Sequence, residues 1–391
     1  MRTFPQSEML QRLPAQFFEG LVKKVKEKQQ QGHDIINLGQ GNPDLPTPPH
    51  IIKALQHAAE DPLTHQYSPF QGYDLLKDAV ATFYKREYGV EIDANKEVAI
   101  LFGAKAGLAE ISPCLLNPGD IALMPDPGYP DYMSGIALAN AESIFMPLLE
   151  KNNFLPDYTA IPEDLKDQAK VMFLNYPNNP TTATATKEFF DETVAVAKKH
   201  NICVVHDFAY GAIGFDGEKP QSFLQSEGAK EVGVEIYTLS KTYNMAGWRV
   251  AFAVGNPSVI QSIQLLQDHM FMSLFGGIQH AAAEALSGDQ QPVRELVQTY
   301  QERRNRFIKK LLEMDIEVEA PRGTFFVWMR VPAGYSSETY ADLLLEKAHV
   351  VAAPGVGFGY YGEGYIRLGL LADAERLEEA AIRIGRLGDS L

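Results

Sequence analysis

The sequence predicts an α/β fold in which a mostly parallel sheet is covered by helices on both faces and is joined to a smaller domain. Between about residues 48 and 260, short apolar runs alternate with helical or turn-rich stretches, which is typical of βαβ units. After residue 260, two long helical segments precede two strands with a helix between them, which indicates a smaller α+β domain. A chain of 391 residues is long enough for two or three domains.

The elements are expected in the following order along the chain. The first thirty residues predict an amphipathic helix with Gly32 as its C-cap. Its apolar face consists of Phe17, Phe18, Leu21, Val22 and Val25. Six apolar runs then predict buried strands, namely VAILF ending at Phe102, IALM at Met124, VMFLN at Asn175, ICVVH at His206, EIYTLS at Ser240 and VAFAV at Val254. The second long helix is QPVRELVQTYQERRNRFIKKLLEM, and GTFFVWMRV and GYIRLGLL predict the two later strands.

The composition excludes several classes of partner. Thirty-five Lys and Arg against fifty Asp and Glu give a net charge of −15 without a basic stripe, so nucleic acid is not an expected partner. Cys114 and Cys203 lie far apart without metal-ligand spacing, which predicts no zinc site, no metal and two buried thiols in a reducing compartment. No apolar run approaches eighteen residues, so we expect a cytoplasmic protein with no membrane partner.

Residues that follow the strands are the candidates for a binding site, because ligands of open α/β sheets bind beyond the carboxyl ends of the strands. Gly103, Ala104 and Lys105 follow the first run and open a helix, where backbone N–H groups can receive a phosphate. For an isolated match, a tight strand-to-helix turn is the simpler explanation of these three residues. The chain has no GxGxxG after a strand and no GxxxxGK[ST], so dinucleotide and P-loop sites are not expected.

Two further turns present polar or aromatic groups at the same edge. Tyr129, in PDPGYP, can stack on a planar ligand or pack within its own loop. Asn179, in NYPNNPT, can offer its amide to a ligand or belong to an Asn-Pro turn.

Three charged residues occupy strongly apolar settings. Asp207 ends the strand ICVVH and is costly to bury without a cation. Lys241 follows an apolar strand, where partial burial lowers the pKa of its amine and makes it a usable nucleophile. Arg367 lies within the strand YIRLGL and requires a carboxylate, from the chain or from a substrate. Together with the phosphate turn and the tyrosine, these residues describe a planar ring with a phosphate arm, a nitrogen that needs an anion and an aldehyde that needs a lysine. That ligand is pyridoxal phosphate.

The sequence resembles the class I/II aminotransferases of fold type I over nearly its whole length. The motifs of that family occur in the family's order as LGQGNPDLPTP, HQYSPFQG, GAKAGL, PDPGYPDY, NYPNNPT, HDFAY, TLSKTYNMAGWRVAF and YIRLGL. The segments PAQFFEGLVKKV and HDIINLGQGNPDLPTP also resemble bacterial methionine-salvage aminotransferases, which aminate 4-(methylsulfanyl)-2-oxobutanoate, typically from glutamine.

The resemblance implies a role for each residue that faces the cofactor ring. Lys241 is expected to form the Schiff base and then to move the proton between Cα and the cofactor as general base. Asp207 is expected to keep the pyridine nitrogen protonated. Asn179 and Tyr210 are expected to bond the ring hydroxylate, and Tyr129 to stack on the ring.

The resemblance also implies how the phosphate and the substrate are bound. The phosphate ligands are expected to be Gly103, Ala104, Lys105, Thr238 and Arg249, with Tyr67 contributed by the other subunit of a homodimer. Arg367 is expected to bind the substrate α-carboxylate with help from Asn179 and the backbone near Gly41.

Two positions depart from the family pattern. Thr182 stands where the family usually has Gly after Asn-Pro-Thr, and it would be strained if the loop requires a left-handed conformation. Thr238 replaces a more frequent serine and keeps the hydroxyl.

The resemblance therefore implies a transaminase that acts by a ping-pong mechanism on amino acids and 2-oxo acids. Its large domain, with a seven-stranded sheet, is expected at residues 46–285, and its small domain at residues 1–45 plus 286–391. No motif supplies a second arginine that could bind a carboxylate on the substrate side chain. This favours a substrate with an apolar side chain, such as a flexible thioether, over an aspartate-type substrate. The alternatives are an aspartate, aromatic or broad-range aminotransferase, a C–S lyase of the same fold, and a non-catalytic regulatory module that binds the cofactor.

Overall fold

The computed structural model describes residues 2–15 and 17–388, and the central feature of this part of the chain is a seven-stranded sheet. The strands are β2 (Val98–Leu101), β3 (Ile121–Asp126), β4 (Glu142–Pro147), β5 (Ala169–Asn175), β6 (Cys203–Asp207), β7 (Gly233–Thr238) and β8 (Ala251–Gly255). Their order across the sheet is β2-β8-β7-β6-β5-β3-β4. Of these seven strands, β8 runs opposite to the other six, so the mostly parallel α/β sheet is confirmed.

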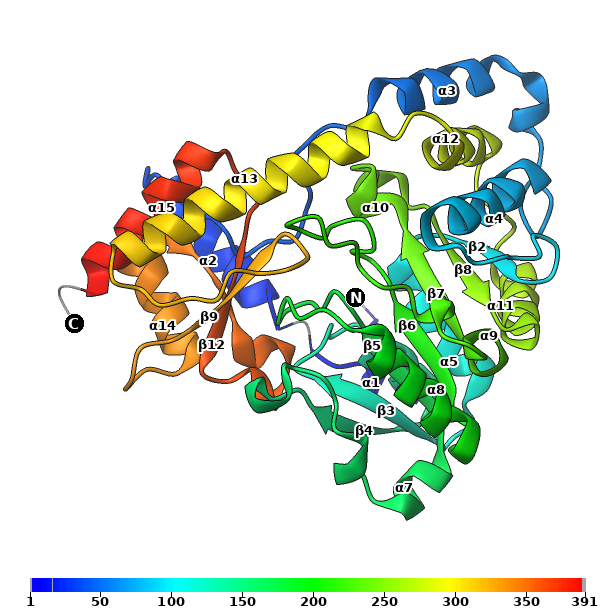
Figure 1. Ribbon diagram of the computed structural model, residues 1–391, viewed down its shortest axis with the longest axis horizontal. Helices are drawn as coiled ribbons and strands as arrows, with labels where there is room; N and C mark the ends of the chain where they lie inside the picture. The colour runs from blue at the N-terminus through cyan, green and yellow to red at the C-terminus, as the bar shows by residue number, and fades with distance from the viewer. Residues whose placement is uncertain (1, 16, 389–391) are drawn as a thin grey trace.

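Helices cover both faces of this sheet (Figure 1). In β2, Val98 and Ile100 pack into one apolar core and the alternating Ala99 and Leu101 into another, as expected for a strand buried on both sides. The first core is covered by α3 (Pro49–Glu60), α4 (Asp74–Tyr88), α8 (Lys187–His200) and α12 (Gly276–Ser287). The second is covered by α5 (Ala104–Leu115), α6 (Tyr132–Ala139) and α11 (Pro257–Met270). This part of the chain also contains short helices, namely α1 (Glu8–Gln11), α7 (Glu163–Gln168), α9 (Ala229–Val232) and α10 (Leu239–Thr242).

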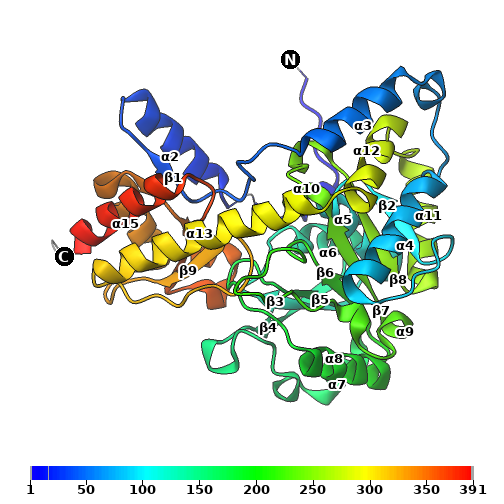
Figure 2. The same cartoon turned by 45° about the horizontal axis from the view of Figure 1, so that its top comes forward.

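A second, smaller α+β part combines the two ends of the chain (Figures 1 and 2). Its antiparallel sheet has the order β11 (Ala353–Pro354), β12 (Tyr365–Gly369), β9 (Phe326–Arg330). It also contains α2 (Glu19–Gln30), α13 (Gln291–Glu313), α14 (Ser337–Leu343) and α15 (Ala374–Gly388). N-terminal β1 (Ile36–Asn37) pairs in parallel with β10 (Val350–Val351), which fixes the N-terminal segment to the C-terminal third of the chain. The domain limits given above stay a prediction.

The structure differs from the sequence-based element assignment in the N-terminal and C-terminal segments. The N-terminal helix α2 begins at Glu19, so Phe17 and Phe18 precede it instead of lying on its face. Between residues 257 and 313, all of which the structure describes, there are three helices, α11, α12 and α13, instead of two long ones. The seventh strand, β4, had no apolar run to predict it because it is an edge strand and most of its residues are partly exposed.

The run EIYTLS ends as a strand at Thr238 and not at Ser240. Thr238 is the N-cap of α10, and its side chain accepts a hydrogen bond from the N–H of Ser240. Lys241 therefore stands in a single helical turn three residues past the strand. This turn presents the lysine at the carboxyl edge of the sheet.

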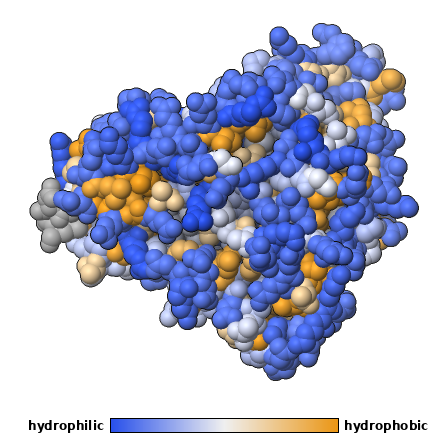
Figure 3. Space-filling model, viewed as in Figure 1, coloured by the Kyte–Doolittle hydropathy of each residue, from blue (hydrophilic) through white to orange (hydrophobic). Residues whose placement is uncertain are grey.

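The surface and the cysteines agree only in part with expectation. No helix in the described residues is both long and apolar enough to span a bilayer. The face in Figure 3 is largely hydrophilic, with apolar residues in separate patches. Cys114 and Cys203 form no disulfide, but both are half-buried where full burial was expected.

Thr182 adopts the conformation that the family's glycine would favour. Its φ is +64°, in the left-handed region that a β-branched side chain rarely occupies. The loop requires this conformation because the Thr182 N–H donates to the Asn178 carbonyl at 2.9 Å, and the Asn178 N–H donates to the Ala183 carbonyl at 2.8 Å. The strain expected from the sequence is therefore present in the loop that carries Asn179.

Replacing Thr182 by Gly should stabilise the protein by about 0.5–1 kcal/mol, because relief of the left-handed strain exceeds the added entropy of the unfolded chain. The free energy of unfolding in urea is the measurement. Thr184→Gly is the matched control, since Thr184 lies in the same loop without a positive φ and should lose stability. A stability loss for Thr182→Gly as large as that of the control would contradict the assignment of strain.

Candidate active site

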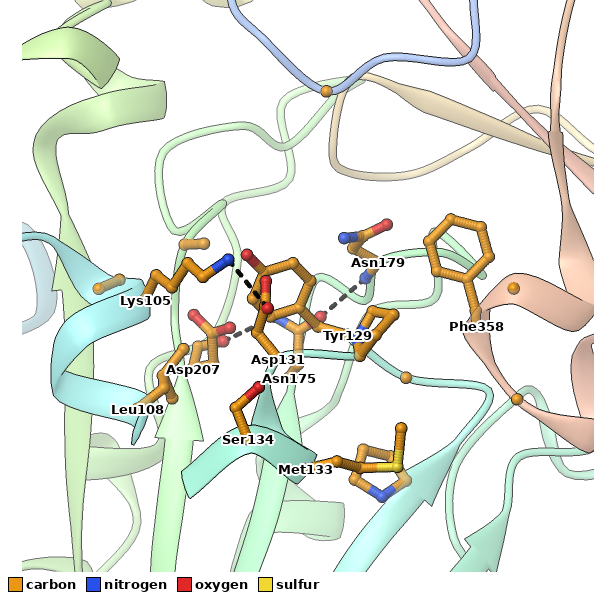
Figure 4. A pocket seen from close by; sticks show the side chains of 18 of the residues that line it. Lys105, Leu108, Tyr129, Asp131, Met133, Ser134, Asn175, Asn179, Asp207 and Phe358 are labelled. Atoms are coloured by element: carbon orange, nitrogen blue, oxygen red, sulfur yellow. Dashed lines mark hydrogen bonds and ion pairs between the residues drawn. The ribbon is translucent and has the colours of Figure 1, made fainter. Parts of the chain in front are cut away.

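A pocket of about 730 Å³ lies at the carboxyl edge of the central sheet, between that sheet and the small α+β part. Most of the residues predicted from sequence line it, namely Gly41, Ala104, Lys105, Tyr129, Asn179, Asp207, Tyr210, Thr238, Lys241, Arg249 and Arg367. Figure 4 shows Lys105, Tyr129, Asn179 and Asp207 converging on this space from different elements. Residues separated by more than 300 positions in the sequence thus share one cavity.

Asp207 ends β6 and is 5% exposed. Its Oδ2 accepts a hydrogen bond from the Tyr132 hydroxyl at 2.8 Å, whereas its Oδ1 is buried and has no partner among the described residues. Burial raises the pKa of this carboxyl to about 6, against the opposing effects of Tyr132 and Lys241. An unpartnered buried oxygen of this kind is suited to a cationic N–H donor.

Lys241 presents its amine to the same space. Its Nζ donates to the Gly41 carbonyl at 2.8 Å and lies 5.4 Å from the centre of the Phe325 ring. Burial lowers the pKa of this amine to about 8, and the nearby Arg367 and Arg249 lower it further while Asp207 raises it. A substantial fraction of the amine is therefore neutral near pH 8, as a nucleophile or base must be.

Arg367 projects from β12 and is 7% exposed. Its guanidinium donates to Asn179 Oδ1 at 2.7 Å and to the Gly39 carbonyl at 3.0 Å, and its Nε has no partner. It also lies over the rings of Phe326 and Phe358, at 4.0 and 4.6 Å. Its described hydrogen-bond partners are neutral, so this buried cation can take a carboxylate from a ligand.

The N-terminus of α5 forms a cradle for an anion. Gly103 is the N-cap, with a φ of +90°, and a Cβ there would clash with the Arg249 guanidinium. The Thr238 and Ser240 hydroxyls lie in the same wall and bond each other at 2.9 Å. The positive helix end, the guanidinium and the hydroxyls suit a phosphate. The side chain of Lys105 is engaged elsewhere, because its Nζ pairs with Asp131 at 2.9 Å, so its expected role as a phosphate ligand at the helix start stays a prediction.

Two tyrosines flank the space between Lys241 and Asp207. Tyr129 lines the pocket with its ring edge-on to Tyr132, at 5.6 Å between centres. Tyr210 is buried against Phe325 and Phe326, and burial raises the pKa of its hydroxyl. Both rings are positioned by other aromatic side chains.

Tyr67 lies apart from this group. It is 86% exposed and does not line the pocket of its own chain. A contact of Tyr67 with a phosphate would therefore have to involve the pocket of a second chain.

Four residues that sequence reasoning missed belong to the site or its support. Asn175 donates from Nδ2 to the Asp207 carbonyl and accepts the Asn179 N–H at Oδ1, both at 2.8 Å. Asp126 accepts the N–H groups of two residues after Phe358, which ties β3 to the C-terminal part. Ser240 lines the cradle and Tyr132 holds Asp207. Asn175 and Asp126 each end a strand, so the strand-end signal could have found them. Tyr132 ends the motif PDPGYPDY, but no sequence signal indicated its contact with Asp207.

The described residues fit pyridoxal phosphate. The unpartnered Oδ1 of Asp207 suits a protonated ring nitrogen, and the cradle at Gly103 suits a phosphate. Lys241 lines the same pocket, and its amine suits an aldehyde. These three features are independent of one another, and together they match the three ends of that molecule.

Comparison with known proteins gives one consistent result. The family model of the class I and II aminotransferases matches residues 33–384. The chain is 61% identical over 384 residues to L-glutamine–4-(methylsulfanyl)-2-oxobutanoate aminotransferase of Bacillus subtilis, covering 98% of this chain and 96% of that protein. It is 52% identical to transaminase BacF of the same organism, covering 97% and 96%. A substrate-bound BacF structure matches with a TM-score of 0.94 at 51% identity, covering 99% and 98% of the two chains.

The ionised carboxyl of Asp207 should destabilise the cofactor-free protein. Folding raises the pKa of this carboxyl from 3.8 to about 6, so the protonated form is favoured in the folded state. The folded protein therefore has its full stability below about pH 4, where the carboxyl is protonated, and loses stability as the pH rises through 6. Asp207→Asn should therefore stabilise the cofactor-free protein at pH 8 by about 2 kcal/mol and have little effect at pH 4.

Urea unfolding at the two pH values measures this effect. Asp157→Asn is the control, because hydrogen bonds from Thr159 lower the pKa of that exposed carboxyl and no gain is expected there. An Asp207→Asn variant that is less stable than the parent at pH 8 would show that the buried carboxylate does not destabilise the folded protein.

Proposed function

This chain belongs to the class I and II aminotransferases, which depend on pyridoxal phosphate, and we propose that it transfers the amino group of glutamine to 4-(methylsulfanyl)-2-oxobutanoate. The activity as a transaminase follows from family membership. The choice of substrates is the proposal. It is supported by the shape and charge of the pocket and by the 61% identity to a protein with these substrates.

Pyridoxal phosphate, when bound, supplies an aldehyde that captures amines and a protonated ring that withdraws electrons from the substrate Cα. We assign the residues around it as follows. Asp207 Oδ1 holds the proton on the ring nitrogen, Asn179 and Tyr210 bond the ring oxygen, and Tyr129 stacks on the ring. The phosphate is held by the backbone N–H groups of the α5 terminus with Thr238 and Arg249. Lys105, whose Nζ is paired with Asp131, would contribute its backbone N–H to this terminus.

We assign the covalent attachment of the cofactor and the proton transfer to Lys241. Its amine would hold the aldehyde carbon of the cofactor when no substrate is bound. Once free, Nζ would accept the proton from the substrate Cα as general base and return it as general acid. The lowered pKa of Lys241, about 8, suits both tasks because the amine must accept and release a proton near neutral pH.

One observation carries the substrate proposal, and it concerns the cations of the pocket. Arg367 is free to bind one carboxylate, while Lys105 is already paired with Asp131. Lys241 and Arg249 are committed to the cofactor. The remaining wall is largely apolar, with Leu108, Met124, Met133, Phe145, Phe17, Phe18 and Phe358. A substrate with one carboxylate and a flexible apolar chain such as a thioether satisfies this wall.

We further propose that the active unit is a homodimer in the cytoplasm. Tyr67, at 86% exposure, is the residue that would reach the phosphate of the second subunit. The unpaired thiols of Cys114 and Cys203 suit a reducing compartment. Mixing a Lys241→Ala chain with a Tyr67→Ala chain should restore activity through hybrid dimers that hold one intact site. Proven mixing without recovered activity would argue against a shared site.

Lys241 should carry the cofactor covalently. The purified protein should be yellow, and borohydride reduction followed by peptide mapping should place the label on Lys241. Lys105 is the internal control, because it lies in the same pocket but is paired with Asp131. Label on Lys105 would refute the assignment, whereas Lys241→Ala should abolish turnover and keep part of the noncovalent cofactor binding.

The ratio kcat/KM should be higher for 4-(methylsulfanyl)-2-oxobutanoate with glutamine than for oxaloacetate with glutamate. Oxaloacetate places a second carboxylate against an apolar wall, where no described cation is free to receive it. The 2-oxo acids of leucine and phenylalanine should also react, since one or two methylenes in an apolar pocket change binding by only about 1–3 kcal/mol. The reverse order of the two main pairs would overturn the substrate proposal and leave the transaminase activity intact.

A further inference from the structure

Tyr132, which the sequence reasoning did not single out, lies directly behind the carboxylate of Asp207. It is the first residue of α6, its side chain is fully buried, and it does not line the pocket. Its hydroxyl donates to Asp207 Oδ2 at 2.8 Å. The distance between the two residues in the sequence is 75 positions, so the contact exists only in the folded chain.

The ring of Tyr132 is held rigidly on two sides. It stacks on Phe173 of β5 with 5.2 Å between ring centres and 16° between planes. Its other neighbour is Tyr129, whose ring meets it edge-on at 5.6 Å and 79°. Helix α6 also packs closely on α5, because a Cβ on Gly135 would come within 2.5 Å of the Ala109 carbonyl oxygen. The hydroxyl therefore has little freedom to leave Asp207.

The contact with Tyr132 determines which oxygen of the Asp207 carboxylate remains without a partner. With Oδ2 engaged by Tyr132 and the Asp207 main-chain carbonyl held by Asn175, Oδ1 is left as the unpartnered oxygen. The other charged or titratable groups around Asp207 are Lys241 on α10, His206 beside it on β6, and Tyr129 and Tyr210. Of these, His206 turns away and bonds Glu235 at 2.7 Å, and Lys241 Nζ bonds Gly41. Tyr132 is thus the side chain whose hydrogen bond orients this carboxylate.

We propose that Tyr132 is a positioning residue, which fixes the Asp207 carboxylate toward the ring nitrogen of pyridoxal phosphate and keeps it ionised in a dry site. The inference rests on the role proposed above for Asp207 and is independent of the choice of substrates. Burial alone disfavours the anion, and a hydrogen bond from a neutral hydroxyl to a charged acceptor opposes this effect. Among the influences that lower the pKa of Asp207, the bond from Tyr132 is the largest.

The test is Tyr132→Phe, which removes one oxygen and keeps the ring stack. Tyr158→Phe is the matched control, because the Tyr158 hydroxyl is also buried and bonds a side chain, Thr193 Oγ1, at 2.8 Å, but lies outside the pocket. Cofactor binding to the full-length cofactor-free protein is followed by absorbance from pH 5 to pH 8. We expect Tyr132→Phe to weaken the Kd for pyridoxal phosphate about tenfold at pH 7 and to shift the acidic limb of binding upward by about one pH unit. Tyr158→Phe should change neither quantity.

The same measurement in an Asp207→Ala background separates this inference from the proposal on which it rests. If Tyr132 acts through Asp207, Tyr132→Phe should have no further effect on the Kd or its pH dependence in that background. An equal effect with and without Asp207, or no effect with Asp207 present, would overturn the inference. Unchanged cofactor binding by Asp207→Ala alone would instead refute the role of Asp207.

A second variant covers the case in which Tyr132→Phe does not fold. Phe173→Leu loosens the stack behind Tyr132 and leaves both polar groups in place. It should move the Kd and the acidic limb in the same direction by a smaller amount. A Phe173→Leu protein that folds and binds the cofactor as the parent does would count against rigid positioning by Tyr132.

Discussion

The removal of charge from water at the carboxyl edge of the central sheet is the constraint on which this structure depends. Asp207 and Arg367 are buried and Lys241 is half-buried. Loss of contact with water favours the neutral form of each group, which raises the pKa of Asp207 to about 6 and lowers the pKa values of Lys241 and Arg367 to about 8 and 10. Three charged groups in one cavity would cost stability without return in a protein that bound nothing. Each becomes favourable when a ligand brings the missing partner, namely a protonated nitrogen, an aldehyde or a carboxylate. These charged groups therefore destabilise the folded protein when no ligand is bound, and a ligand that supplies their partners offsets that cost.

Neutral dipoles hold these charged groups in position without neutralising them. The Gly41 carbonyl accepts a hydrogen bond from Lys241, and the Gly39 carbonyl and Asn179 Oδ1 accept from Arg367. The Tyr132 hydroxyl donates to Asp207. The loop that supplies the two glycine carbonyls is itself anchored. Arg303 of α13 binds Asp44 through two hydrogen bonds of 2.9 and 2.8 Å and also bonds the Leu370 carbonyl. The geometry of the site is therefore set before any ligand arrives.

The pocket depends on both parts of the chain, because neither part contains all the groups. The sheet supplies the anion, the lysine and the phosphate cradle, while β12 and the N-terminal loop supply the carboxylate-binding arginine and its carbonyl partners. Asp126 at the end of β3 accepts the N–H groups of Tyr360 and Tyr361 and so joins the two parts at the mouth of the pocket. The aromatic residues before α2 complete the apolar wall.

The sequence by itself determined the fold class, the buried strands and the residues that gather at their carboxyl ends, because apolar periodicity and strand-end chemistry are local properties of the chain. It also indicated the strained position of Thr182, whose φ of +64° the structure bears out. Tertiary structure alone decided the rest. The edge strand β4, the end of β7 at Thr238, the pairing of Lys105 with Asp131 and the contact of Tyr132 with Asp207 all depend on neighbours in space. Burial, and with it the pKa of each charged group, arises only when segments distant in the sequence pack together and exclude water.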